Sequence, residues 1–147
     1  MDLIMLTPTE SAQALALPLF LEMVPCGFPS PAQDYVEKEL DLNEYCIRHR
    51  SATYYLRAHG DSMRDGFLFN GDLLVVDSAM KPEHGDIVVA GMGSEFTVKR
   101  LQTRPKLCLQ PMNPAFPPIY PDPDELQIFG VVTHIIHRTR EVMKCLD

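Results

Sequence analysis

Ser62 and Lys99 are the two side chains of this sequence that together could carry out acyl transfer. A free hydroxyl is a poor nucleophile and needs a base close by. A neutral lysine amine can take the hydroxyl proton, whereas the guanidinium of the neighbouring Arg100 stays protonated in proteins. The backbone amides of Ser62 and Met63 are candidates to hold the oxyanion that forms when a serine attacks a carbonyl. If the two side chains meet in the fold, they could carry out acyl transfer by a serine with a lysine as its base.

Two expected strands position these side chains. Residues 53–59 alternate in character and predict a strand that ends at a glycine just before Ser62. Residues 96–101 predict a second strand, in which a period of two puts Lys99 on the opposite face from Arg100. If Lys99 faces the interior, burial lowers its pKa. Two simpler interpretations stay open: the serine stands in an ordinary turn, and the lysine faces solvent while the Arg100 stem packs inward.

A third segment has the features of a peptide that Ser62 could attack. Gly27 lacks a side chain, so its backbone can enter a narrow cleft and bend there. Pro25 and Pro29 restrict the conformations of the chain on either side. The Cys26–Gly27 bond is therefore a candidate scissile bond. A competing interpretation makes Cys26 itself a nucleophile, but the local sequence supplies it with no histidine partner.

Several short segments occur in the order found in a known group of peptidases. They are Gly60-Asp61-Ser62-Met63, Asn70-Gly71-Asp72-Leu73-Leu74-Val75-Val76-Asp77, His84-Gly85-Asp86-Ile87-Val88-Val89-Ala90 and Glu95-Phe96-Thr97-Val98-Lys99-Arg100-Leu101. Together they resemble the self-cleaving serine–lysine peptidases that include the LexA repressor. Two further segments narrow the resemblance to the UmuD proteins of the bacterial DNA-damage response: Cys26-Gly27-Phe28-Pro29-Ser30-Pro31-Ala32 and Pro111-Met112-Asn113. The resemblance covers residues 17–137, which is most of the chain.

The resemblance implies that Ser62 attacks the Cys26–Gly27 bond with Lys99 as its base, without a cofactor. UmuD proteins have cysteine before the scissile glycine, as this chain does. The resemblance also implies a homodimer, and a RecA filament on single-stranded DNA that favours cleavage. A further implied partner is a UmuC-type catalytic subunit, with which the shortened protein forms a lesion-bypass polymerase. The sequence leaves open whether the cleaved segment reaches its own cleft or that of a second subunit.

A short apolar motif near the N-terminus suggests one more partner. Ala16-Leu17-Pro18-Leu19-Phe20 is similar to peptides that dock on the replicative sliding clamp, and similar residues of UmuD proteins are linked to clamp contact. Leu17, Leu19 and Phe20 are the candidates for this contact. We favour the simpler interpretation, in which they pack the N-terminal segment against the globular domain, because short apolar motifs match easily.

Two other functions stay open beside the self-cleaving peptidase. One is a non-enzymatic module that keeps the fold and binds a polymerase or clamp; the presence of both Ser62 and Lys99 counts against it. The other is a signal-peptidase-like enzyme, which shares the serine–lysine pair but needs a membrane anchor. No anchor is visible, because the apolar run at residues 15–21 is too short to span a bilayer and no basic residue precedes it.

Composition sets limits on partners and location. The chain has 147 residues, which indicates about one domain. Its net charge of −7 repels a phosphate backbone, so we expect protein partners and no direct nucleic-acid contact. The four cysteines lack metal-ligand spacing, and we expect free thiols in the reducing cytoplasm. His134 and His137 are expected on opposite faces of a strand, so no metal site is predicted.

The chain divides into an extended N-terminal arm, residues 1–30, and a β-rich peptidase-like domain, residues 31–147. The arm contains several prolines and no basic residue, so we expect it to be mobile, with at most a short helix around residues 11–17. Residues 30–40 are expected to hold a turn of helix. Residues 41–49 predict a helix that begins at an aspartate suited to the N-cap.

The domain is expected to be mainly β, a curled LexA-like arrangement of several strands with one or two short helices. Strands are predicted at 53–59, 73–77, 86–92, 95–101, 106–110 and 126–136. Gly66, Gly71 and the segment 91–93 predict turns between strands. The proline-rich residues 111–125 predict an extended surface loop. No role is predicted for the tail, residues 138–147.

Overall fold

The computed structural model describes residues 13–20, 23–28 and 37–140 of the chain. A two-stranded antiparallel sheet pairs β1 (Ala16–Phe20) with β2 (Glu37–Asp41). The strands of a larger sheet are β3 (Thr53–Arg57), β4 (Leu73–Asp77), β5 (Ile87–Met92), β6 (Glu95–Gln102), β7 (Cys108–Gln110) and β8 (Leu126–Ile136). The described helices are short: α1 (Leu42–Cys46) and the 3₁₀ turns η1 (Arg50–Ala52) and η2 (Arg64–Gly66). The prediction of a mainly β chain is confirmed.

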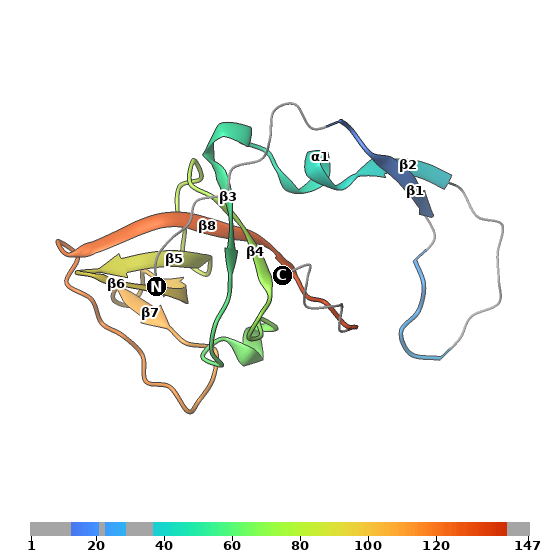
Figure 1. Cartoon of the computed structure of the whole chain (residues 1–147). Helices are drawn as coiled ribbons and strands as arrows, with labels where there is room; N and C mark the ends of the chain where they lie inside the picture. Colours follow the sequence, from blue (N-terminus) through green and yellow to red (C-terminus); the bar gives the residue numbers. More distant parts are fainter. Residues whose placement is uncertain (1–12, 21–22, 29–36, 141–147) are drawn as a thin grey trace.

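The larger sheet is antiparallel and curls around its long strand β8. Its strand order is β3-β4-β8-β5-β6-β7. β8 pairs with β5 along one part of its length and with β4 along the other, and it crosses the whole domain in Figure 1. The pairing register shifts between Val75 and Val76 and again between Val89 and Ala90. Such bulges increase the twist of a strand, and here they let the end of β3 approach β6.

The core consists of two apolar clusters. One joins side chains of β3, β4 and β5 to the loop after β3, and its buried members are Tyr54, Leu56, Met63, Leu68, Leu74, Val76 and Val89. The other joins β5 to β6, β7 and β8 through Val88, Ala90, Leu101, Leu109 and Val131. Alternate residues of β5 belong to different clusters, as the period of a strand with both faces buried requires.

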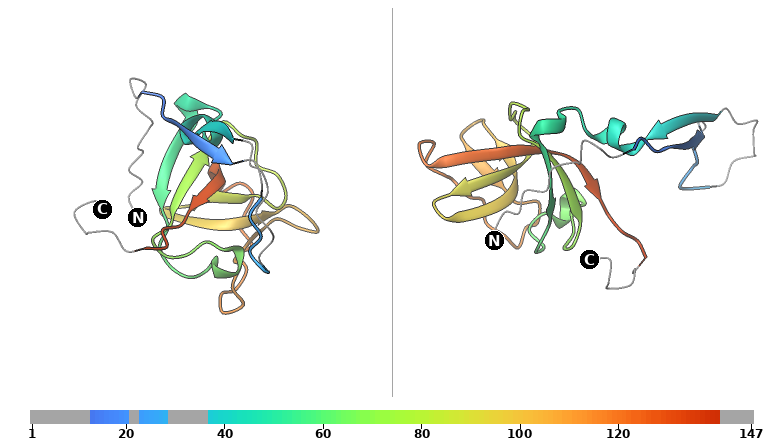
Figure 2. Two further views of the ribbon diagram at one scale, coloured as in Figure 1. Left: turned by 90° about the vertical axis from the view of Figure 1, so that its right-hand side faces the viewer. Right: turned by 45° about the horizontal axis from the view of Figure 1, so that its top comes forward.

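The β1–β2 hairpin stands apart from the larger sheet in Figures 1 and 2, whereas α1 contacts it through the ring of Tyr45, which packs against His134 of β8. Asp41 caps α1 by accepting a hydrogen bond from the amide of Asn43 at 2.9 Å. The predicted N-cap is therefore present, but the helix ends at Cys46, three residues before the predicted end. No residue of α1 is buried, and tertiary packing usually supplies most of the stability of a longer helix.

Two other helical predictions are wrong over the described residues. Ala16 and Leu17, which end the predicted 11–17 helix, lie in β1. The described part of the predicted turn at residues 30–40 lies in β2. The two strands pair from Ala16 with Asp41 onward. This long-range pairing overrides the local pattern; residues 11–12 and 30–36 lie outside the described residues. The division into an arm and a domain after residue 30 stays a prediction.

The predicted strands of the domain are all present, and two of them, 73–77 and 126–136, have the predicted ends. The turn predicted at residues 91–93 is wrong in part, because Gly91 and Met92 belong to β5. A Cβ atom on Gly91 would lie 2.5 Å from Cε2 of Phe129. Glycine is needed there because an aromatic ring packs on the backbone. Gly93, with a φ of +62°, makes the turn.

Candidate functional site

The loop that carries Ser62 begins where β3 leaves the sheet. The backbone of Ala58 still pairs with its neighbours, donating to Asp72 O and accepting from the amide of Gly71, both at 2.8 Å. Gly60 follows with a φ of +97°, a left-handed conformation that L side chains rarely adopt. Its amide donates to Oδ1 of Asn70 at 2.9 Å. The chain therefore turns sharply at Gly60 and brings Ser62 to the end of the strand, as the sequence predicts.

Lys99 faces the interior from β6. Its exposed fraction is only 8%, while its neighbour Arg100 is exposed. Leu101, two residues further along the strand, is also buried. The predicted alternation of β6 is therefore confirmed, and the interpretation in which Lys99 faces solvent is wrong.

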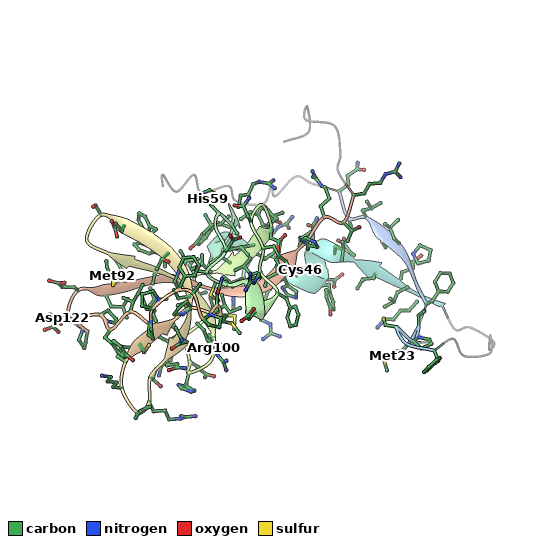
Figure 3. All side chains as sticks on the ribbon, turned by 90° about the horizontal axis from the view of Figure 1, so that it is seen from below. Met23, Cys46, His59, Met92, Arg100 and Asp122 are labelled. Carbon is green, nitrogen blue, oxygen red and sulfur yellow. The ribbon has the colours of Figure 1, made fainter. Side chains whose placement is uncertain are left out.

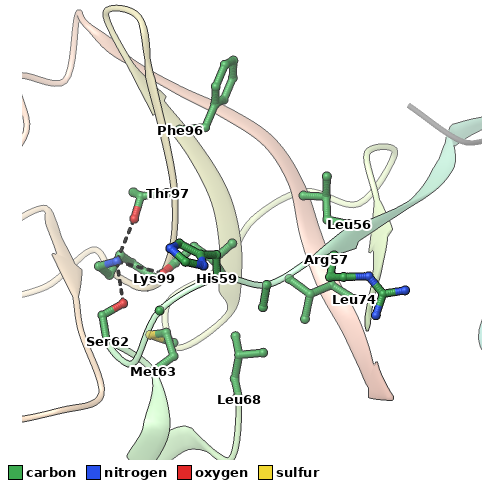
Figure 4. A pocket seen from close by; sticks show the side chains of 13 residues that line it. Leu56, Arg57, His59, Ser62, Met63, Leu68, Leu74, Phe96, Thr97 and Lys99 are labelled. Carbon is green, nitrogen blue, oxygen red and sulfur yellow. Dashed lines mark hydrogen bonds between the residues drawn. The ribbon is translucent and has the colours of Figure 1, made fainter. Parts of the chain in front are cut away.

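The Nζ atom of Lys99 lies 2.9 Å from Oγ of Ser62. The same nitrogen donates to Oγ1 of Thr97 at 2.7 Å and to the carbonyl oxygen of Val98 at 3.1 Å, as the dashed lines in Figure 4 show. Burial lowers the pKa of Lys99 from its ordinary value. Desolvation disfavours an ammonium ion and so favours the neutral amine that a base needs.

The hydrogen-bond partners of Lys99 are compatible with a base. The Val98 carbonyl can only accept, so it receives one N–H of the amine. The hydroxyl of Thr97 can accept a second. A neutral amine then has its lone pair left for the O–H of Ser62. A charged ammonium would instead donate to all three oxygens. The same contacts therefore hold Lys99 in place before and after it takes a proton.

Ser62 and Lys99 line a pocket of about 220 Å³ between the end of β3 and β6. Strands β3 and β6 are far apart in the sheet order, so the curl of the sheet creates this pocket. Most of its other walls are apolar, and they include Leu56, Met63 and Leu68. Figure 4 shows these side chains on one side of the polar pair. A pocket of this kind suits an extended apolar peptide better than a charged ligand.

Two residues to which the sequence assigned no role belong to the site. Thr97 stands two positions before Lys99, and the period of the strand puts the two on the same face of β6, but the pattern alone does not indicate that Thr97 contacts the amine. Asn113, with an exposed fraction of 7%, donates through Nδ2 to the carbonyl of Asp61 at 2.9 Å. It lies far from Ser62 in sequence, and no local pattern connects the two.

The candidate scissile bond does not lie next to Ser62 and Lys99. The segment 23–28 follows β1 at the far end of the hairpin, and Cys26 is exposed. Figure 3 shows Met23 and His59, which lines the pocket, on opposite sides of Cys46. A Cβ atom on Gly27 would have no neighbour within 4 Å. The structure therefore brings the two predicted catalytic side chains together and leaves the predicted peptide outside the pocket.

The candidate clamp contacts lie on β1. Their exposed fractions are 54% for Leu17, 38% for Leu19 and 55% for Phe20. The hairpin that carries them stands away from the larger sheet (Figure 1). The favoured interpretation, in which these side chains pack the arm against the domain, is therefore wrong for this conformation. The clamp contact itself stays a prediction.

The described residues contain no group of three or more metal-ligating side chains. His134 packs its ring against that of Tyr45, with centroids 5.8 Å apart, and Nδ1 of His137 lies 2.6 Å from Oδ1 of Asp72. Three of the cysteines, at positions 26, 46 and 108, are free thiols; the fourth, Cys145, lies outside the described residues. Among the described residues, no helix is long and apolar enough to cross a membrane.

Comparisons with known proteins identify the family of this chain. The model of the family described as Peptidase S24-like matches residues 18–133. Protein SamA of Salmonella typhimurium is 56% identical over 138 residues, which cover 94% of this chain and 97% of SamA. Protein MucA of Escherichia coli is 55% identical over 121 residues, covering 81% and 83% of the two chains. LexA repressor 1 of Pseudomonas putida is 38% identical over 130 residues, covering 86% of this chain and 63% of the repressor.

Proposed function

Because the chain belongs to the Peptidase S24-like family, we propose that it is a serine peptidase that cleaves itself between Cys26 and Gly27. Ser62 is the nucleophile and Lys99 is its general base. The observation that carries the proposal is the 2.9 Å separation of Lys99 Nζ and Ser62 Oγ in a site that lowers the pKa of the lysine. A hydroxyl and a base within hydrogen-bond reach are what nucleophilic catalysis requires.

In the first step, the neutral amine of Lys99 takes the proton of Ser62 while Oγ forms a bond to the carbonyl carbon of Cys26. The amides of Ser62 and Met63 are proposed to hold the oxyanion. In the part of the chain that the structure describes, no protein acceptor is hydrogen-bonded to either amide. The tetrahedral intermediate then collapses, the bond to the Gly27 nitrogen breaks, and Lys99 returns its proton to that nitrogen.

In the second step, water attacks the ester that links Ser62 to the Cys26 carbonyl. Lys99 takes a proton from the water and gives it back to Oγ as the ester breaks. The products are the fragments 1–26 and 27–147, and the enzyme side chains end in their starting protonation states. No cofactor takes part in this scheme.

The position of the scissile segment sets a condition on the reaction. Residues 23–28 lie away from the pocket in this structure (Figure 3), so they have to move to a pocket before Ser62 can attack. Once the tethered peptide is seated, the reaction gains from a high effective concentration, worth up to about 7–11 kcal/mol in well-oriented cases. Regulation is therefore expected to act on docking of the segment. We propose that a RecA filament on single-stranded DNA favours the docked state.

A partner role follows from the same family. We propose that the protein is a homodimer and that its shortened form joins a UmuC-type subunit as a lesion-bypass polymerase in the cytoplasm. The exposed apolar side chains of Leu17, Leu19 and Phe20 favour an additional contact with the sliding clamp. A second candidate function is thus a binding module that keeps the fold and does not cut.

One experiment separates the two functions. The purified chain is held at pH ~10, near the ordinary lysine pKa of about 10.4, and its intact mass is followed over days. The peptidase should yield the fragments 1–26 and 27–147. Ser62→Ala and Lys99→Ala should stop the reaction while the melting curve stays cooperative. Lys99→Arg is the matched control, since it keeps a positive charge but cannot act as a base. An unchanged wild-type mass would favour the binding module.

A further inference from the structure

We propose that Asn113 is a positioning residue that, together with the backbone of Met112, orients the two amides of the oxyanion site. The inference rests on the function proposed above, because it assigns a role within that reaction. It concerns a loop on the side of Ser62 that faces away from the pocket. Asn113 itself touches neither the substrate nor the reacting atoms.

Three hydrogen bonds join this loop to the segment that carries Ser62. Nδ2 of Asn113 donates to the carbonyl of Asp61 at 2.9 Å. The amide of Met112 donates to the carbonyl of Ser62 at 2.8 Å, and the amide of Asp65 donates to the carbonyl of Met112 at 2.7 Å. The carbonyls on either side of the Ser62 α-carbon are therefore both held from one direction.

The planarity of the peptide bond turns these contacts into an orientation of the amides. The carbonyl of Asp61 and the amide of Ser62 belong to one planar trans peptide, in which C=O and N–H point in opposite directions. The carbonyl of Ser62 and the amide of Met63 form the next peptide. Holding both carbonyls on the side of residues 112 and 113 therefore turns both amides to the other side.

That other side is the pocket of the proposed nucleophile. Ser62 and Met63 line the pocket with Lys99. Met112 and Asn113 line a different pocket, of about 290 Å³, together with Asp65 and other side chains. The loop thus binds the carbonyls of Asp61 and Ser62 on the side opposite the pocket that Ser62 and Lys99 line.

Asn113 is itself held in the orientation that this role needs. It is 7% exposed, and its Oδ1 accepts a hydrogen bond from the amide of Ala115 at 3.0 Å. With Oδ1 engaged there, the amino group is the part of the side chain that faces Asp61. The Asp61 carbonyl has a second, longer contact from the amide of Arg64 at 3.3 Å. Loss of the Asn113 side chain is therefore expected to loosen the peptide between Asp61 and Ser62 without unfolding the loop.

The test measures self-cleavage at alkaline pH for Asn113→Ala and Asn113→Asp. Removing one oxyanion donor outright costs about 10²–10³-fold in rate, and misorienting one should cost at least about ten-fold. Asn113→Asp keeps the side-chain volume and an acceptor for Ala115 but presents oxygen to the Asp61 carbonyl, so it should be as slow or slower. Gln110→Ala is the matched control: Gln110 ends β7 just before this loop and donates to the Pro111 carbonyl at 3.1 Å, and its side chain makes no hydrogen bond to residues 61–63. It should cut at the wild-type rate.

A second measurement separates orientation of the amides from collapse of the loop. In a Ser62→Cys background, alkylation of the new thiol by iodoacetamide needs an accessible nucleophile but forms no oxyanion. The sulfur–carbon bond forms as iodide leaves, and peptide mapping identifies the labelled position. Adding Asn113→Ala should leave this rate unchanged, although the same substitution slows peptide cleavage in the Ser62 chain.

Each outcome decides a different point. An Asn113→Ala chain that cuts as fast as wild type refutes the positioning role and leaves the proposed function intact. Equal losses in cleavage and in alkylation also refute it, because the loop would then only hold the fold. A wild-type chain that never cuts refutes the proposed function and, with it, this role. Slower cleavage with unchanged alkylation supports the inference.

Discussion

Oγ1 of Thr97 lies 2.7 Å from Nζ of Lys99, closer to the amine than the hydroxyl of Ser62 at 2.9 Å. Thr97 and Lys99 belong to β6 and stand two positions apart, so the geometry of the strand sets the distance between their side chains. The contact occupies one N–H of the amine and leaves its lone pair free to face Ser62. Thr97 is therefore expected to orient the base.

Replacement of Thr97 by valine tests this orientation. Thr97→Val removes the hydroxyl and keeps the β-branched shape, so the strand should be preserved. General base catalysis contributes about 10²–10⁴-fold, and we expect loss of the orienting contact to slow self-cleavage by about ten-fold. Thr97→Ser should restore most of the rate. The measurement is the rate of fragment formation at alkaline pH; a Thr97→Val chain with the wild-type rate would show that the contact has no role.

The pH dependence of cleavage should report the buried amine. Only neutral Lys99 can accept a proton, so the rate should rise with pH in proportion to the neutral fraction. Because burial lowers the pKa of Lys99, the rate should level off below the ordinary lysine pKa of about 10.4. Fragment formation measured over a series of buffers gives the midpoint. A rate that continues to rise through pH ~10.4 would contradict a desolvated base.

The same lowered pKa affects stability. Above the ordinary lysine pKa, Lys99 is neutral in both the folded and the unfolded chain, and its burial carries no charge penalty. As the pH falls from about 10.4 toward the lowered value, the unfolded state binds the proton more readily and the folded state loses stability. Lys99→Met removes this effect. The melting temperature of the variant minus that of wild type should therefore grow as the pH falls through this window; a constant difference would mean that Lys99 titrates normally.

The positions of Ser62 and Lys99 in the fold could be predicted from the sequence because local patterns determine where each side chain points. Strict alternation along 96–101 separates Lys99 from Arg100, and Gly60 marks the sharp turn before Ser62. The order of the strands was harder to infer. Val76 pairs with Val132 of β8, a contact between distant segments that no local window contains, and the curl of the sheet depends on such pairings.

Other features depend on contacts that leave little trace in local patterns. The sequence of Ala16–Phe20 indicates only a short apolar motif, and its strand forms because it pairs with Glu37–Asp41 as β2. Gly91 is predicted in a turn, but the structure places it in β5, where the ring of Phe129 packs on its backbone. The role assigned to Asn113 likewise requires the fold. Its contact with Asp61 joins two loops that are 52 residues apart.

His49 connects the segment after α1 to the larger sheet. Its Nδ1 lies 2.6 Å from Oδ2 of Asp77, a carboxylate that is almost fully buried at the end of β4. The Ala79 amide also donates to this carboxylate, at 2.9 Å. His49→Ala removes one partner of a buried acceptor and should destabilise the fold by about 1–3 kcal/mol. Chemical denaturation measures the loss, and the exposed neighbour Arg48, replaced by alanine, is the control. Equal effects of the two substitutions would contradict the importance of the His49–Asp77 contact.

Gly130 lies in β8 where neighbouring strands approach its backbone closely. A Cβ atom there would lie 2.5 Å from Cγ1 of Val76 and 3.3 Å from both the Asp77 carbonyl and the hydroxyl of Tyr54. Val76 and Tyr54 belong to the core cluster and have little freedom to move. We expect Gly130→Ala to lower the free energy of unfolding by about 1–3 kcal/mol through overpacking.

Gly27→Ala is the matched control for that substitution. A Cβ atom at Gly27 meets nothing within 4 Å, so the same chemical change should leave the melting temperature of the resting chain unaltered. It should slow cleavage, because the added methyl has to enter the pocket beside Ser62 when the segment docks. Gly130→Ala should therefore lower the melting temperature, whereas Gly27→Ala should leave the melting temperature unchanged and lower the rate of fragment formation. If Gly27→Ala destabilised the chain as much as Gly130→Ala, the segment 23–28 would have to be packed in solution, and its exposed position in the resting state would be wrong.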